Sequence, residues 1–408
     1  MDPYDQAVMD YLPAMERMGK SYQRVRGAYC PTSFGPKGLD LLWAIWPNTA
    51  EQSSFLGQKS NASLLAANMI MRYHLTGDRD YARKIAYPFV RSVVSFWEDY
   101  LVLDQSGATD DPGRYVVMND CINEVSFFMQ LPLGSKEQKR ALDVNPPYTL
   151  GLVRMITTAA IDMSTDLGVD AKLQAKWRDM IARLSRFPVT VRNGLPVFDV
   201  KEIGSTSLES TNMCSIQHIY PANAISLSSD PALVQTAVNT ITFKNLWENT
   251  NSFSTIFAAA ARVGYDPQVI LDNMLQVSKK RMWPNFAFKF GGGGIENEAG
   301  VPGGLNEMML QSHEGILRIF PCWPKGRPAS FSNIRAYGAF LVNARTDGAS
   351  VIDVSILSDR GAPCIVMNPW LGKSVQVRQE GKPTEVVAGD RITISTVAGA
   401  CYNLTPMP

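Results

Sequence analysis

The sequence has few histidines and no clustered cysteines, which argues against a metal centre. The three histidines, His74, His218 and His313, are far apart, so a Ser-His-Asp triad is also disfavoured. The six cysteines are scattered and form no C-x-x-C pair, which argues against zinc and against a dense disulfide framework. We expect most cysteines to be free and buried, and we expect no metal and no organic cofactor.

Neither an excess of one charge nor a long hydrophobic run is present. The 39 Lys and Arg residues balance 38 Asp and Glu residues, and no block of like charges appears, which predicts no nucleic-acid or anionic-lipid partner. No apolar run reaches the roughly 18 residues of a membrane span. Residues 1–24 are typical of an amphipathic helix rather than a signal peptide. We expect no membrane partner; the oligomeric state is left open.

From residue 4 to about 313 the apolar spacing is helical. In residues 78–101 apolar side chains recur every three or four positions, and Pro88 should kink or split the segment. Residues 148–167 carry a similar stripe, with Gly168 placed to end the helix. Further helices are expected at 5–24, 60–75, 170–185, 231–244, 252–263, 266–280 and 303–313.

Neighbouring helices pair as antiparallel hairpins, 60–75 with 79–101, 148–167 with 170–185, and 252–263 with 266–280. This rhythm predicts a mainly α protein, an incomplete α/α6 barrel built as a toroid of helix hairpins. Helix 5–24 has no hairpin partner, so we expect sequence upstream to be missing and an apolar face of this helix to be exposed.

After residue 320 the pattern becomes strand-like. Residues 334–344 resemble a strand, 346–348 a turn, and 351–357, 375–378 and 391–396 further strands. We therefore expect two domains, an N-terminally truncated α/α-barrel catalytic-type domain at 1–325 and a small antiparallel β-domain at 326–408.

Three stretches carry more polar groups than folding requires, namely 116–124, 214–223 and 291–300. The glycine run at 291–294 is no phosphate loop, because no Gly-Lys-Ser/Thr follows it. Two carboxylate loops at one end of a helical barrel would supply the acid and the base of glycoside hydrolysis. Alternatively, Glu124 is a solvated loop carboxylate, Glu296 and Glu298 favour a helix N-terminus, and His218 is structural.

Several segments together resemble the family 95 glycoside hydrolases, the α-L-fucosidase and α-L-galactosidase group. The most specific is 307–315, which reads Glu-Met-Met-Leu-Gln-Ser-His-Glu-Gly, followed by Phe320 and Pro321. Residues 61–102 resemble the family as well, and so, more loosely, do 167–170 with Trp177, 219–223 and 334–340. The matches run in order over nearly the whole chain.

The resemblance implies an α/α6 barrel followed by a β-domain, and hydrolysis with inversion. It places the general acid at Glu124 and the base at Glu296, with Glu298 as the alternative. The sugar would be bound by Asn119, Asp120, Asn123, His218, Tyr220 and Asn297. The family's water-orienting asparagines lie in a His-x-Asn-x-Asn motif that would precede this chain, and a later histidine motif is replaced near Asn212 and Ser215.

The leading hypothesis is thus an inverting glycoside hydrolase of α-L-fucosidase type that removes a terminal sugar from an oligo- or polysaccharide. The resemblance also implies a periplasmic or extracellular location. A non-catalytic carbohydrate-binding or scaffold remnant of such an enzyme is one alternative, and a polysaccharide lyase is another. A lyase would need a Tyr/His base and a basic cleft, and no such cluster is visible in the sequence.

Overall fold

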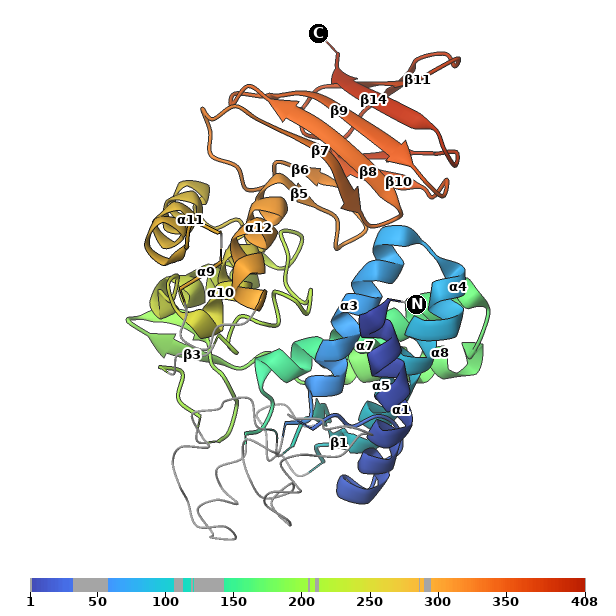
Figure 1. Cartoon of the computed structure of the whole chain (residues 1–408), viewed down its shortest axis with the longest axis vertical. Helices are drawn as coiled ribbons and strands as arrows, with labels where there is room; N and C mark the ends of the chain where they lie inside the picture. Colours follow the sequence, from blue (N-terminus) through green and yellow to red (C-terminus); the bar gives the residue numbers. More distant parts are fainter. Residues whose placement is uncertain are drawn as a thin grey trace. The chain divides into compact units, whose positions relative to one another are not determined.

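The computed structural model describes residues 2–31, 58–105, 113–118, 120, 143–204, 206–209, 213–285, 287–289 and 295–407, without the side chains of 250, 251, 295 and 296. The chain divides into two units, whose elements are labelled in Figure 1. The first unit is Met1–Ile70, Asp78–Ala224 and Gln235–Lys244, and the second is Met71–Gly77, Ile225–Val234 and Asn245–Pro408. Each is described by itself.

The first unit is mainly helical. Its helices are α1 (Pro3–Tyr22), most of α3 (Asn61–Thr76), α4 (Arg79–Tyr81), the π-helix η2 (Ala82–Ala86), α5 (Tyr87–Tyr100), α7 (Pro147–Leu167), α8 (Ala171–Arg183) and most of α9 (Pro231–Lys244). Two antiparallel hairpins accompany them, β1 (Val102–Leu103) with β2 (Tyr115–Val116), and β3 (Val189–Arg192) with β4 (Leu195–Phe198).

Local sequence signals set the limits of several of these helices. Pro88 stands at the start of α5, and the turn before it is a π-helix in which the Tyr87 N–H bonds to the Ala82 carbonyl, five residues back. This is the expected split, because proline has no N–H for the regular ladder. Gly168 ends α7 in the left-handed conformation with φ 71°, as predicted.

Helix α1 is covered rather than exposed. Val8, Met15 and Met18 are buried, and among the described residues of α1 no large apolar side chain is exposed. Polar contacts hold the helix as well, since the Tyr81 hydroxyl donates to Asp5 at 3.0 Å. The predicted exposed apolar face of this helix is therefore wrong, because α5 packs against α1 and Tyr81 of α4 bonds to it.

The helices of the second unit are α10 (Thr250–Arg262), α11 (Pro267–Arg281) and α12 (Ile295–Met309). Helix α12 begins about eight residues before the predicted 303, inside a stretch whose glycines and proline read as a loop. The glycines serve packing instead. A Cβ on Gly300 would lie 2.4 Å from the Phe253 carbonyl oxygen, and one on Gly304 would lie 2.4 Å from the Phe257 Cβ. Glycine thus lets α10 and α12 approach closely.

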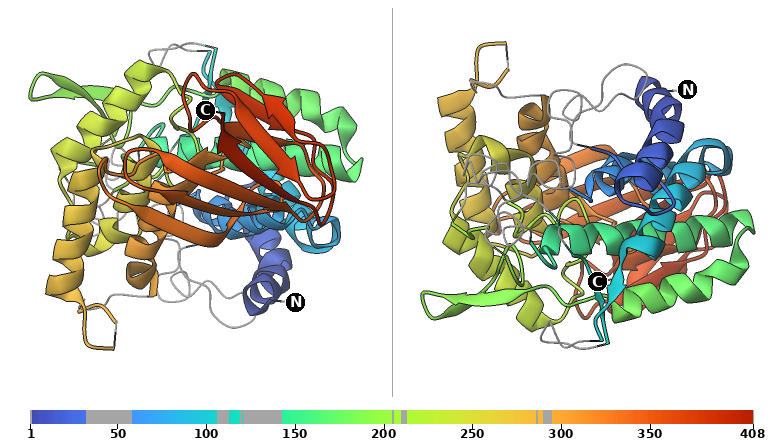
Figure 2. Two further views of the ribbon diagram at one scale, coloured as in Figure 1. Left: turned by 90° about the horizontal axis from the view of Figure 1, so that it is seen from above. Right: turned by 90° about the horizontal axis from the view of Figure 1, so that it is seen from below.

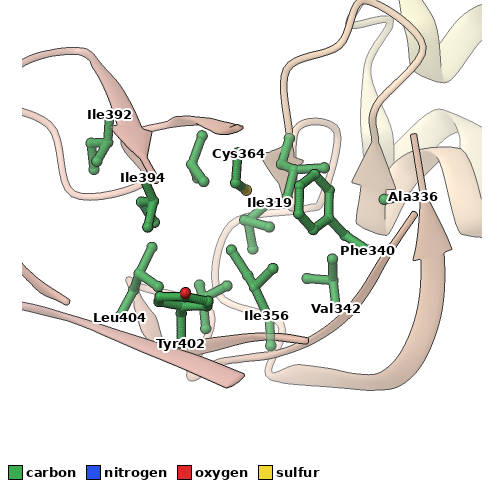
Figure 3. Close-up of a cluster of buried hydrophobic side chains, with 14 of the residues drawn as sticks. Ile319, Ala336, Phe340, Val342, Ile356, Cys364, Ile392, Ile394, Tyr402 and Leu404 are labelled. Atoms are coloured by element: carbon green, nitrogen blue, oxygen red, sulfur yellow. The ribbon is translucent and has the colours of Figure 1, made fainter. Parts of the chain in front are cut away.

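Antiparallel strands form the C-terminal part of the second unit. They are β5 (Leu310–Gln311), β6 (Arg318–Ile319), β7 (Ala329–Ala336), β8 (Phe340–Thr346), β9 (Val351–Ser358), β10 (Cys364–Met367), β11 (Val375–Gln379), β12 (Glu385–Val387), β13 (Arg391–Ile394) and β14 (Cys401–Pro406). The main sheet has the order β12-β11-β14-β9-β8-β7, and β10 pairs with β13. Figure 3 shows the core, with Cys364, Ile392 and Ile394 facing Ile356, Tyr402 and Leu404.

Two details differ from the sequence-based expectation for this region. The expected strand 334–344 is two strands, because Gly338 and Ala339 take positive φ values of 88° and 60° and reverse the chain. The β-core also contains Leu310, Leu317 and Ile319, so β-structure begins before residue 326. The expected turn at 346–348 is present, with Gly348 at φ 91°. The domain boundary at 325/326 stays a prediction.

Some compositional expectations can also be compared with the structure. Cys30, Cys214, Cys322 and Cys364 are free and buried, as predicted, whereas Cys401 is free and exposed, and Cys121 lies outside the described residues. Within the described ranges, no helix has the length and apolarity to cross a bilayer, and no group of three or more His, Cys, Asp or Glu could hold a metal ion.

Candidate active site

The predicted catalytic residues are only partly within the described structure. Glu124, Asn119 and Asn123 lie outside the described residues, and so does the side chain of Glu296. The described residues nearest to them are Asp120 in the first unit and, described separately, the start of α12 in the second unit. The roles predicted for Glu124 and Glu296 stay predictions.

Asp120 stands four residues before Glu124, at the end of an extended segment. That segment begins at β2, which pairs with β1, and continues to Met118, whose carbonyl accepts a 2.7 Å hydrogen bond from the Tyr100 hydroxyl. Asp120 then pairs with Asp143 through two backbone hydrogen bonds of 2.9 Å. The backbone entering the Glu124 segment is thus fixed on both sides.

The Asp120 side chain is fully buried and holds two donors. One carboxylate oxygen accepts the Lys59 backbone N–H at 2.9 Å, and the other accepts the hydroxyl of Thr149 in the first turn of α7. Burial, with the Asp120 charge adding to it, raises the pKa of Tyr100, so this phenol stays protonated. The carboxylate has no surface to offer a ligand in this arrangement, and its geometry is that of a positioning group. The predicted sugar contact of Asp120 is not tested.

Asp143, the backbone partner of Asp120, is a second buried carboxyl. Burial raises its pKa to about 6, and the nearby Asp120 charge adds to the rise, while hydrogen bonds from Thr206 oppose it. Gly204 makes room for this group, because a Cβ there would lie 2.2 Å from an Asp143 carboxylate oxygen. The Asp143 carboxyl therefore changes its charge near pH 6.

Asn145 joins the same segment to a more distant strand-like stretch. Its side-chain oxygen accepts the Val117 N–H at 2.9 Å, and its amide nitrogen donates to Glu202 at 2.5 Å. Backbone bonds between Val144 and residues 202 and 203 run alongside. Sequence reasoning missed Asp143, Thr149 and Asn145, because their partners are distant in sequence; the only local signal is a polar cluster before the prolines at 146 and 147.

His218 lies in the interior of the first unit. Its ring is 4.5 Å from that of Phe187 and 4.6 Å from that of Phe198, and it is fully buried. Neither ring nitrogen has a hydrogen-bond partner among the described residues, and burial lowers the pKa of His218 to about 3. The imidazole is therefore neutral, and a direct sugar contact would require it to be uncovered. Tyr220 is half-buried and precedes Pro221 through a cis peptide bond.

The start of α12 carries the remaining predicted residues. Glu296 lies in its first turn, and Glu298 is exposed. Asn297 is only 3 % exposed, and its side-chain oxygen finds no hydrogen-bond partner within the described part of the chain. A helix N-terminus stabilises the ionised form of nearby carboxylates, which suits a base rather than an acid.

The side chains of Gln311, Ser312 and Glu314 have hydrogen-bond partners in the second unit, whereas the buried ring nitrogens of His313 have none among the described residues. The Gln311 amide donates to the Ala261 and Glu307 carbonyls, and the Tyr337 backbone N–H donates to the Ser312 hydroxyl at 3.0 Å. Glu314 accepts from Ser226 at 2.7 Å and from the Arg318 guanidinium. This stretch therefore fastens the helices to the sheet, which explains its sequence without a catalytic role.

The other two histidines, His74 and His313, are also neutral. His74 stacks on Tyr337 with ring centroids 4.8 Å apart, and burial lowers its pKa to about 4. Burial also lowers the pKa of His313 well below its usual range, and the positive charges of Arg262 and Arg318 add to the effect. Both rings are neutral at physiological pH. His74 lies on α3, whereas α12 ends at Met309 and His313 lies in a turn, so the predicted extension of that helix to residue 313 is wrong.

Comparison with known proteins identifies the family to which this chain belongs. The chain belongs to glycosyl hydrolase family 95, whose catalytic domain it matches over residues 3–309. No curated protein matches the chain.

Solved structures resemble the chain at low sequence identity. One is assigned as a kojibiose phosphorylase from the human microbiome, with 10% identity and a TM-score of 0.50, covering 95% of this chain and 53% of that one. Another is the Streptomyces avermitilis α-L-rhamnosidase complexed with L-rhamnose, with 12% identity and a TM-score of 0.46, covering 98% and 38%. The chain thus spans about half or less of these structures, and the first likeness supports the fold alone.

Proposed function

We propose that this chain is the catalytic part of an inverting glycoside hydrolase of α-L-fucosidase type, which removes a terminal sugar from an oligo- or polysaccharide. The observation that carries the proposal is the family 95 match over residues 3–309. The finer fold assignment, an incomplete α/α6 barrel, belongs to the same proposal and is supported by the succession of helix hairpins α7–α8 and α10–α11.

Glu124 is the proposed general acid. In its protonated form it gives a proton to the glycosidic oxygen as the bond to the anomeric carbon breaks. The anchoring of Asp120 by Lys59 and Thr149 supports this role, because a residue four positions away needs a fixed backbone to reach one oxygen reproducibly.

Glu296 is the proposed general base, with Glu298 as the alternative. The base takes a proton from a water molecule, whose oxygen attacks the anomeric carbon from the face opposite the leaving group and inverts the configuration. The first turn of α12 favours an ionised carboxylate, and exposure of Glu298 leaves it accessible to water. Inversion requires carboxyl groups roughly 6.5–9.5 Å apart, which leaves room for the water.

Substitution of each glutamate separates the roles. Glu124→Gln should lower hydrolysis of an unactivated α-L-fucoside by about 10²–10⁴, yet spare an aryl fucoside whose leaving group needs no proton. Glu296→Gln should slow both substrates, because both need an activated water, while Glu298→Gln should act weakly if Glu296 is the base. Glu380→Gln, an exposed glutamate of the β-domain, is the matched control.

Turnover by Glu124→Gln at the parent rate on the unactivated fucoside would overturn the acid assignment. Sugar binding without turnover in the parent chain would instead favour a non-catalytic carbohydrate-binding protein. The resemblance implies an aspartate and an asparagine at the positions of Glu296 and Glu298, and this difference keeps the second candidate in view.

A further inference from the structure

An exposed tryptophan stands at the end of α11, among several cations. Trp283 is 52% exposed, and it follows the last turn of the helix, which contains Lys279, Lys280 and Arg281. Lys289 places its ammonium 4.5 Å from the centroid of the Trp283 ring. The name "α11 patch" is used below for Leu275, Lys279, Lys280, Trp283 and Lys289.

The tryptophan is held on a short hairpin rather than on a loose loop. The Trp283 N–H donates to the Ala287 carbonyl at 2.7 Å, and the Lys289 N–H donates to the Arg281 carbonyl at 2.5 Å. Phe288 anchors the hairpin, because its ring lies 5.0 Å from that of Phe253 in α10. Figure 2 shows the hairpin, in orange after α11, projecting from the helices of its unit.

The surface of α11 continues the patch. Leu275 and Lys279 are spaced by four residues and so lie on one side of α11, whereas Trp283 follows after the helix has ended at Arg281. Leu275 is 54% exposed, and a shallow depression of about 400 Å³ lies there, lined by Asp272, Leu275, Gln276, Lys279 and Lys280. Exposed apolar side chains and long cationic side chains thus occur together at the end of α11.

The local charge is positive although the whole chain is nearly neutral. This region contains four cations, and two carboxylates lie near them. The cations are Lys279, Lys280, Arg281 and Lys289. The carboxylates are Glu248, which accepts from Lys280 and from Gln276, and Asp272, which accepts from Gln268. From the net charge of +1 we expect no nucleic-acid or anionic-lipid partner. The net charge is a sum over the whole chain, however, and does not reveal a local cluster of cations.

The α11 patch is also close in sequence to the proposed base. Six peptide bonds separate Lys289 from Ile295, where α12 begins, so their Cα atoms lie within about 23 Å of one another at full extension. Glu296 is the next residue. A polymer that binds the patch can therefore extend toward the start of α12.

We propose that the α11 patch is a binding subsite for an anionic polysaccharide, in which a sugar ring stacks on the open face of Trp283. Lys279, Lys280 and Lys289 would attract the carboxylate or sulfate groups of the polymer. The exposed ring supplies stacking area at a low entropic cost, and the lysines supply charge that a neutral glycan would not use. The inference rests on the proposed function and names the substrate class that this surface favours.

Affinity electrophoresis of the whole chain tests the proposal, in native gels containing polygalacturonate, dextran sulfate or neutral dextran. Retardation by an anionic polymer, and none by dextran, is expected; the two anionic gels distinguish carboxylate from sulfate. Trp283→Ala should weaken retention roughly fivefold, Trp283→Phe less, and Lys279→Ala combined with Lys289→Ala should reduce retention and its salt dependence. Leu371→Ala and Lys325→Ala, at exposed positions elsewhere in the second unit, are the matched controls.

Equal retention by dextran and by the anionic polymers would overturn the proposal, as would retention by none of the three. So would retention that Trp283→Ala and the double lysine variant leave at the parent level, or that the control variants lower as much. The test is independent of catalysis, because binding to the α11 patch should persist in Glu124→Gln. Binding without hydrolysis in the parent chain would therefore count against the proposed glycosidase activity and not against the α11 patch. Hydrolysis without binding would count against the α11 patch and not against the glycosidase activity.

Discussion

Replacement of Asp120 by alanine should destabilise the first unit strongly, although the residue lies at a short extended segment rather than in a helix. The carboxylate is fully buried and accepts hydrogen bonds from the Lys59 N–H and from the Thr149 hydroxyl. Each hydrogen bond to a charged group contributes about 1.5–3 kcal/mol, and a donor left unpaired in the interior costs about as much. The desolvation of the lost carboxylate offsets part of this, so we expect a loss of about 3 kcal/mol.

Urea unfolding followed by tryptophan fluorescence measures this loss, and hydrogen exchange localises it. The Lys59 amide should exchange slowly in the parent and much faster in Asp120→Ala, because its acceptor is gone. Asp390→Ala, an exposed aspartate of the β-domain, is the matched control and should stay within about 0.5 kcal/mol of the parent. A double-mutant cycle with Thr149→Val should give a coupling energy of about 0.5–3 kcal/mol.

Two results would refute this reasoning. The first is an Asp120→Ala variant that unfolds within about 0.5 kcal/mol of the parent. The second is strict additivity with Thr149→Val, because two residues that share a buried hydrogen bond must show coupling. Either result would mean that the carboxylate is not the anchor of the segment that leads to Glu124.

Gly300→Ala should destabilise the second unit by about 1–3 kcal/mol, since its Cβ would meet the Phe253 carbonyl at 2.4 Å, whereas Gly303→Ala, with open space around it, should be neutral or stabilising; equal effects in thermal unfolding would contradict the packing argument. The pKa of His218 is lowered to about 3, so its contribution to stability is complete above about pH 6.5 and is lost as the pH falls. As the pH falls from 6 to 4, the free energy of unfolding of His218→Leu should therefore rise relative to that of the parent by up to about 1.4 kcal/mol per pH unit. Parallel curves of unfolding free energy against pH would exclude this. The pKa of Asp143 is raised to about 6, so its contribution to stability is present below about pH 3.8 and lost as the pH rises. Between pH 4 and pH 8 the free energy of unfolding of Asp143→Asn should therefore rise relative to that of the parent by on the order of 2 kcal/mol. A difference that does not change with pH would contradict burial as the cause.

The sequence predicted the elements whose signals are local. Helix α9 has the predicted limits, and α11, predicted at 266–280, runs from Pro267 to Arg281. These segments have apolar spacing together with a proline at the start. Helix α12 was predicted too short, because Gly300, Pro302 and Gly304 resemble a loop until the close approach of α10 explains them.

The candidate site was less accessible to sequence reasoning. Asp120 was predicted to contact the sugar, but its partners Lys59, Asp143 and Thr149 lie up to 61 residues away, and no periodicity links them. Residues 311–314 were recognised by resemblance, and the tertiary hydrogen bonds explain the side chains of Gln311, Ser312 and Glu314. The local charge of the α11 patch was hidden by the balanced total.

The anomeric configuration of the sugar first released tests the central claim most directly. Proton NMR can follow an α-L-fucoside during the first minutes of incubation with the chain, before mutarotation mixes the anomers. An inverting hydrolase with Glu124 as acid and Glu296 or Glu298 as base must release β-L-fucose first. Initial release of α-L-fucose, or no release, would contradict the account.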